Sequence, residues 1–267
     1  MPPAPKPRVF AHSAAAPQAA AAAVADETYI QRGATANFVV SYAASLGDNG
    51  PTLADAVLAT CEADYARLQD WFGNVPINGL PFNVFIKPGS GGASHATCAD
   101  TGLFCDAFTG TDADLVRSLV VAEADEVFMA NQATGWNCGF NNGEALSRVL
   151  AAEIYPAELT PPGTGVTFAS GETYLESNRD DFVDQNDETD QNFASTGCGT
   201  LFINWLRFQL GFSLNQIVQA GGATLAETYQ NLTGQNDGFQ RFSDLLAANF
   251  PPDSGPYGLT NDNPFPL

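Results

Sequence analysis

The segment LVVAEADEVFM, residues 119 to 129, constrains the fold more than any other feature of this chain. It lies within a predicted helix from about Ala113 to Asn131, which Asp112 can cap. Apolar residues occupy most faces of that helix, and such a helix must be covered on several sides. We therefore expect it at the centre of the molecule, with the other elements packed around it.

The central helix also carries acidic residues, Glu123, Asp125 and Glu126. Burying an unpaired carboxylate costs several kcal/mol, so these groups need partners, protons or a cation. Glu123 and Glu126 are three positions apart and share a helix face, from which Asp125 is predicted to be directed away. Eighteen residues after Glu126, Glu144 opens another predicted helix that ends before Pro156. We expect the three glutamates to face one pocket between the two helices.

Strand patterns and one helical pattern precede the central helix, and helical patterns dominate after it. The chain is thus predicted to be α+β, with a small mixed sheet packed on a central helix and a helical C-terminal lobe. Residues 1–27 form a predicted disordered leader rich in alanine and proline, and residues 28–267 a single domain. Its two parts are residues 28–131, which contain the sheet, and residues 132–267, which are mainly helical. The elements expected before the central helix are a strand over residues 37–46, a helix from Thr52 to Gly73, a strand over 80–89 and an edge strand or hairpin over 101–108.

The charge balance excludes several classes of partner. Ten basic against thirty acidic side chains give a net charge of −20, which repels nucleic-acid backbones and anionic lipid surfaces. No apolar stretch is long enough to span a membrane. The opening residues do not have the pattern of a classical signal peptide, so a soluble protein, cytoplasmic by default, is expected. A peptide or protein ligand stays open as a partner.

Five cysteines are an odd number, so at least one has no partner within the chain. Cys98 and Cys105 flank a short segment and could close a small loop in an oxidising compartment. Buried free thiols are the alternative.

The order of strand, helix, strand, edge strand, central helix and glutamate helix resembles that of the gluzincin metallopeptidases over roughly residues 37 to 160. Members of that family carry H-E-x-x-H on the central helix and a third zinc ligand, a glutamate, on the next helix. When AEADEVF is aligned with this motif, Ala122 and Glu126 take the places of the two histidines. Glu123 takes the place of the general base and Glu144 that of the third ligand. The resemblance implies a zincin-like fold.

The ligands differ from those of the family, and this changes the expected chemistry. Zinc sites of this type need two imidazoles, and the sequence contains only His12 and His95. We therefore predict no zinc and no other resident cofactor. The carboxylates of Glu123, Glu126 and Glu144 would suit calcium, magnesium or manganese if a metal binds there. His95 is interpreted either as a base or ligand that arrives from the edge strand, or as a loop residue bonded to the backbone.

These features predict a degenerate, zincin-like pseudopeptidase or binding protein. The alternative is a hydrolase in which Glu123, Glu126 and Glu144, with His95, supply the acid and the base. A structural network would instead satisfy the glutamates with Arg117, Arg148 and backbone amides. A third hypothesis treats C-terminal aromatic residues as an interaction surface, although such spacing is more typical of a core. Those residues are Trp205, Phe208, Phe212, Phe239 and Phe242.

Overall fold

The computed structural model describes residues 27–89, 92–107, 112–156, 170–189, 191–259 and 261–267. The predicted leader falls outside this part of the chain, except for Glu27. The described elements run in chain order as β1 (Tyr29–Ala34), β2 (Phe38–Ala43), the short 3-10 helix η1 (Ala44–Leu46), α2 (Asn49–Trp71), β3 (Phe82–Pro88), β4 (Ala93–Ser94), β5 (Gly102–Ala107), α3 (Ala113–Gln132), α4 (Asn141–Ile154), α5 (Ser170–Glu176), α6 (Phe193–Asn204), the π-helical turn η3 (Trp205–Gln209), α7 (Leu214–Gln219), α8 (Leu225–Thr233) and α9 (Gly238–Asn249).

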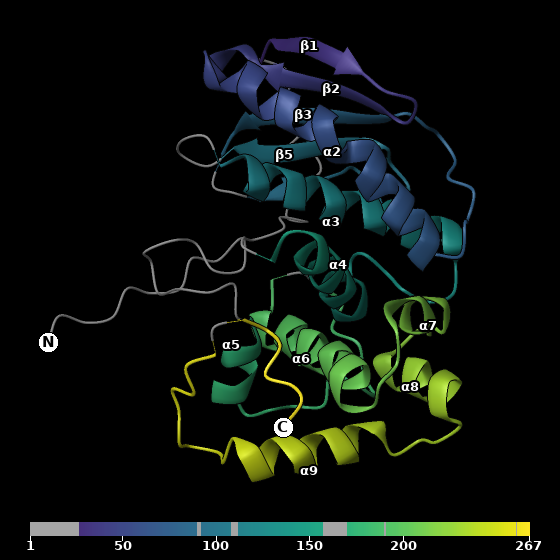
Figure 1. The fold of residues 1–267 in the computed structure, drawn as a ribbon. Helices are drawn as coiled ribbons and strands as arrows, with labels where there is room; N and C mark the ends of the chain where they lie inside the picture. The colour runs from purple at the N-terminus through teal and green to yellow at the C-terminus, as the bar shows by residue number, and fades with distance from the viewer. Residues whose placement is uncertain (1–26, 90–91, 108–111, 157–169, 190, 260) are drawn as a thin grey trace, which may run out of the picture.

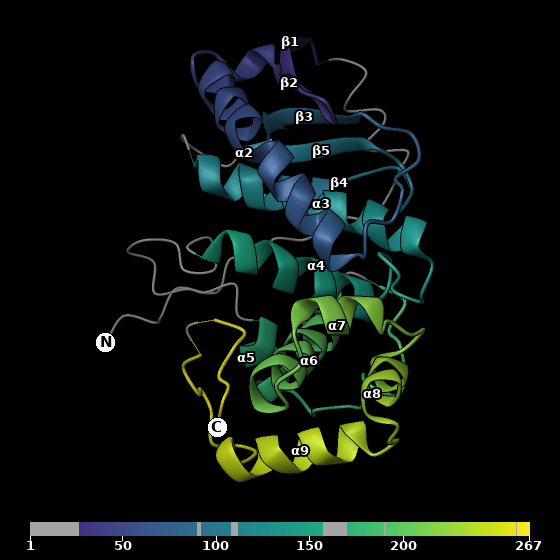
Figure 2. The ribbon, with the colours of Figure 1, turned by 45° about the vertical axis from the view of Figure 1, so that its right-hand side comes forward.

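The predicted α+β class and the small mixed sheet are confirmed. The strand order is β1-β2-β3-β5-β4, in which β2, β3 and β5 are parallel and both outer strands, β1 and β4, are antiparallel. Residues alternate across each strand, so Phe82, Val84 and Ile86 of β3 are buried on one face. Helices α2 and α3 cover that face (Figures 1 and 2). The opposite face carries a row of rings that includes Phe85 and Phe104, stacked at 4.9 Å.

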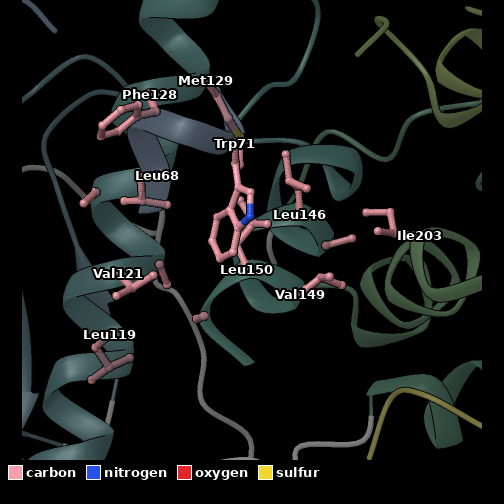
Figure 3. Close-up of a cluster of buried hydrophobic side chains, with 14 of the residues drawn as sticks. Leu68, Trp71, Leu119, Val121, Phe128, Met129, Leu146, Val149, Leu150 and Ile203 are labelled. Carbon is pink, nitrogen blue, oxygen red and sulfur yellow. The ribbon is translucent and has the colours of Figure 1, made fainter. Parts of the chain in front are cut away.

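Helix α3 is central, as its composition requires, because it lies between the sheet and α4. Helix α4 packs in turn on α6, and α9 closes the far end of the helical lobe (Figures 1 and 2). One continuous apolar core joins these layers. Figure 3 draws part of it, with Trp71 of α2, Phe128 of α3, Leu146 and Leu150 of α4 and Ile203 of α6. None of the described helices has the length and apolar character that crossing a membrane requires.

Local signals placed α3 correctly and α4 less well. The Asp112 side chain accepts a hydrogen bond from the Leu115 amide at 3.2 Å, as an N-cap residue does. Helix α4 begins at Asn141, three residues before the predicted start at Glu144. A Cβ on Gly143 would lie 2.0 Å from the Asn137 carbonyl oxygen, so glycine lets this first turn fold directly against the preceding loop.

Three other boundaries differ from expectation. Helix α2 begins at Asn49 and not at Thr52, because Pro51 fits a first helical turn, where no backbone partner is needed for its nitrogen. Strand β2 ends at Ala43, where the 3-10 turn replaces the predicted continuation. Strand β1 and helix α5 were not predicted from the sequence.

A tryptophan joins the loop before α4 to the last turn of α7. The Trp136 Nε1 atom donates to the Val218 carbonyl oxygen at 2.9 Å, and the side chain is buried. The backbones also approach closely, since a Cβ on Gly135 would lie 2.3 Å from the carbonyl carbon of Gly222. Gly135 has φ +125°, a conformation that glycine adopts easily. The loop between α3 and α4 is therefore fixed against α7 and the loop that follows it.

Candidate acidic site between helices α3 and α4

Four acidic side chains are buried where α3 packs on α4. Glu123, Asp125 and Glu126 come from the middle of α3, and Glu144 from the first turn of α4. Their exposed fractions are 1%, 0%, 3% and 3%, respectively. The structure thus brings the predicted glutamates to one helix interface, where they form a buried acidic cluster together with Asp125.

Asp125 belongs to this cluster more closely than its position on the helix suggested. Desolvation raises the pKa of its carboxyl well above the usual range, and the charges of Glu126, Glu123 and Glu144 raise it further. Neither of its carboxyl oxygens has a hydrogen-bond partner within the described residues. The neutral, protonated form of Asp125 is therefore favoured in the fold.

His95 lies directly after β4 and reaches the cluster from the edge of the sheet. Its Nε2 atom lies 2.9 Å from Oε2 of Glu126, and the two side chains are only 7% and 4% exposed. His95 therefore bonds to an acid of α3 and not to the backbone, as the alternative had it, whereas its role as a base or a ligand stays a prediction. The other ring nitrogen, Nδ1, is buried and has no hydrogen-bond partner in the described part of the chain.

A disulfide holds the His95 loop next to α4. Cys98 is bonded to Cys138, which lies 40 residues later in the loop before α4. The proposed pairing of Cys98 with Cys105 is wrong, because Cys105 is a buried free thiol in β5. Desolvation and the nearby charge of Glu123 raise the pKa of the Cys105 thiol well above its usual range. Among the described residues Cys61 and Cys198 are free and buried as well.

The two arginines expected to neutralise the cluster behave differently. Arg117 pairs with Asp114 at 2.6 Å and lies over the Tyr155 ring, at 5.6 Å from its centroid, near the start of α3. Arg148 is buried in α4, one turn after Glu144, and lies 5.9 Å from the centroid of the Phe193 ring. The structural-network hypothesis therefore keeps Arg148 as a candidate, whereas Arg117 is engaged elsewhere.

Arg148 also lines a cleft of about 180 Å³ between α4, α6 and the C-terminal tail. Asp262 of the tail accepts hydrogen bonds there from the Ser170 hydroxyl at 2.8 Å and the Gly171 amide at 2.7 Å. Burial raises the pKa of Asp262 to about 6, although these bonds and the positive charge of Arg148 oppose the shift. This cleft lies on the side of α4 that faces the helical lobe.

The aromatic residues of the lobe form core structure for the most part. Trp205 and Phe242 are buried and in contact, with ring centroids 5.8 Å apart. Phe212 and Phe239 are partly buried against the same core, and Phe208 is 38% exposed. The core interpretation of their spacing is confirmed.

Sequence reasoning missed two features of the site, the buried position of Asp125 and the participation of Cys138. Ligand atoms of His95, Glu126 and Cys138 all lie within 4.8 Å of one another. No local sequence pattern predicts this proximity, since the three residues come from three separate segments of the chain. Comparison with protein-family models, with curated proteins and with solved structures finds no match, so the functional argument depends on the residues of this chain.

Proposed function

We propose that this protein is a gluzincin-like pseudopeptidase, which binds a peptide or protein partner and does not cleave it with zinc. The observation that carries the proposal is the hydrogen bond between His95 and Glu126 within a buried acidic cluster. In the resemblance described above, Glu126 stands where the family has its second zinc-binding histidine. Here that position holds a carboxylate, and its Oε2 atom is hydrogen-bonded to the imidazole of His95, directly after the edge strand.

Two further observations support a site that has lost zinc catalysis. Ala122, aligned with the first histidine, offers no ligand atom. A catalytic zinc site also keeps one coordination position open for water or substrate, whereas the four acids of the cluster are at most 3% exposed. The order of the sheet, with an antiparallel edge strand beside the central helix, is consistent with the resemblance.

The partner that suits this chain is basic. A net charge of −20 draws cationic segments and repels anionic ones. We expect extended peptides rich in lysine and arginine to bind at least about tenfold more tightly than acidic peptides of equal length, at physiological salt. Fluorescence anisotropy with labelled peptides measures this, and mass spectrometry of the recovered peptides tests whether they stay intact. Equal affinity for both peptides, or cleavage of the basic one, would contradict the proposal.

A hydrolase that uses Glu123, Glu126 and Glu144, with His95, is the second candidate. The observation in its favour is the pKa of Asp125, which desolvation and then the charges of the three glutamates raise, because active sites separate the pKa values of neighbouring carboxyls in this way. Such an enzyme could work with or without a hard metal ion such as calcium, magnesium or manganese.

Glu123→Gln distinguishes these functions. In a pseudopeptidase the change removes a charge from a repulsive cluster, so the free energy of unfolding near pH 7 should stay within about 0.5 kcal/mol or rise. In a hydrolase the same change should abolish turnover while the protein stays folded. The measurements are thermal unfolding at several pH values and a screen of peptide, ester and glycoside substrates. Glu188→Gln, at an exposed position, is the matched control.

Each outcome of this comparison has a definite meaning. Wild-type turnover that disappears in Glu123→Gln and survives in Glu188→Gln would establish the hydrolase and overturn the pseudopeptidase. Marked destabilisation by Glu123→Gln, without turnover in either protein, would show that the ionised carboxylate is a paired structural element.

A further inference from the structure

The residues around the disulfide contain three kinds of metal ligand. His95 offers a ring nitrogen, Glu126 a carboxylate oxygen and Cys138 a sulfur, and these atoms lie within 4.8 Å of one another. They come from the edge-strand loop, the centre of α3 and the loop before α4. A second observation also points to a ligand here, since Nδ1 of His95 is buried without a hydrogen-bond partner in the described residues.

The oxidation state of Cys138 decides whether the sulfur can bind a metal. Metals are bound by the thiolate form of cysteine, and a sulfur within a disulfide has no such form. In the structure Cys138 is bonded to Cys98, so the oxidised protein presents only the nitrogen and the oxygen. Reduction would release both sulfurs at the same place.

We propose that reduction of the Cys98–Cys138 disulfide creates a binding site for one Zn²⁺ ion, held by His95, Glu126 and Cys138. A dithiol reductant supplies the two electrons: its sulfurs form a disulfide, and Cys98 and Cys138 each gain a hydrogen. Cys138 then releases its proton to solvent when the ion binds. The thiol of Cys98, bonded to Cys138 before reduction, stands beside the ion as a candidate fourth ligand. This site does not depend on the proposed peptide binding.

The donor set selects the metal. Nitrogen, sulfur and carboxylate oxygen in a tetrahedral arrangement are typical zinc ligands, and a thiolate disfavours calcium and magnesium. Glu123 and Glu144 belong to the same buried acidic cluster as Glu126, and their negative charges favour a cation at this place. The prediction of no zinc rested on Ala122 and Glu126 in place of two histidines, and it stays a prediction for the oxidised protein.

A pair of single substitutions tests the proposal, because each removes the disulfide equally. Cys98→Ser leaves Cys138 as a free thiol and should bind about one equivalent of Zn²⁺ without reductant. Cys138→Ser should bind Zn²⁺ at least about tenfold more weakly, since even outer-shell contacts of metal sites are worth about 10–100-fold. Competition with a chromogenic chelator gives the affinities. Absorption of the Co²⁺ form reports directly on thiolate ligation.

The wild-type chain provides a measurement that does not rely on either variant folding. Oxidised protein should retain almost no Zn²⁺ after dialysis, and protein reduced anaerobically should retain about one equivalent. His95→Gln, reduced in the same way, should lose that ion. Equal retention by the oxidised and reduced chains overturns the proposal, as does equal or tighter binding by Cys138→Ser, whose three other cysteines outside the pair are unchanged.

Discussion

Replacing Cys98 and Cys138 together with serine should lower the free energy of unfolding by about 4 kcal/mol, a value set by the loop-closure entropy of a separation of 40 residues. The bond joins the loop that carries His95 to the loop that leads into α4. Its loss allows the unfolded chain many more conformations and leaves the native contacts largely in place. Urea unfolding followed by tryptophan fluorescence measures the change.

Reductant provides the control for this experiment. The wild-type chain should lose a similar amount of stability when it is reduced, provided that no zinc is present, and the double serine variant should be insensitive to reductant. A drop well under 1 kcal/mol would mean either that the unfolded chain keeps these segments together or that the bond strains the native fold.

Asp125→Leu should stabilise the protein at neutral pH, by an amount on the order of 1–4 kcal/mol. The substitution exchanges a fully buried carboxyl, which has no hydrogen-bond partner within the described residues, for an apolar side chain of similar shape. Because desolvation and the neighbouring glutamates raise the pKa of Asp125 in the fold, its ionisation opposes folding. The contribution of Asp125 to stability therefore falls as the pH rises above about 4, the pKa of an unfolded aspartate.

The stability that Asp125→Leu is expected to add consequently grows with pH. It should be smallest below about pH 3, where the carboxyl is largely protonated in both states, and larger at pH 7 to 8. Thermal and urea unfolding across this range measure it. Asp244→Leu, at an exposed position on α9, should change stability by no more than about 0.5 kcal/mol at any of these pH values. Destabilisation by Asp125→Leu at pH 8 would show that the charged carboxylate supports the fold.

The sequence predicts those parts of the molecule that depend on neighbouring residues. The cap at Asp112, the apolar periodicity of α3 and the glycine that follows α8 are local signals, and each marks an element boundary in the structure. The meeting of the acids on α3 with Glu144 could also be predicted, because two consecutive helices pack against each other. The positions of the acidic residues in the sequence were sufficient to predict this meeting.

Contacts between distant segments could not be predicted in this way. Cys98 had a nearer candidate in Cys105, but β5 directs Cys105 into the core beneath α3, and the loop leaves Cys98 facing Cys138. The bond between His95 and Glu126 depends on the same loop. The burial of Asp125 and the shift of its pKa were missed for another reason, and its direction away from the glutamates stays a prediction. Helix-face geometry sets where a side chain points, whereas its pKa responds to every charge within the buried space around it.

The Trp136 contact links the position of α7 to the segment that carries Cys138 and leads into α4. Trp136 donates a hydrogen bond to Val218 in the last turn of α7, and Cys138 lies two residues further along the chain. A partner that shifts α7 would therefore pull on the segment that sets the positions of Cys138 and Glu144. The segment before α4 is thus anchored at two points, to α7 by the tryptophan and to the His95 loop by the disulfide.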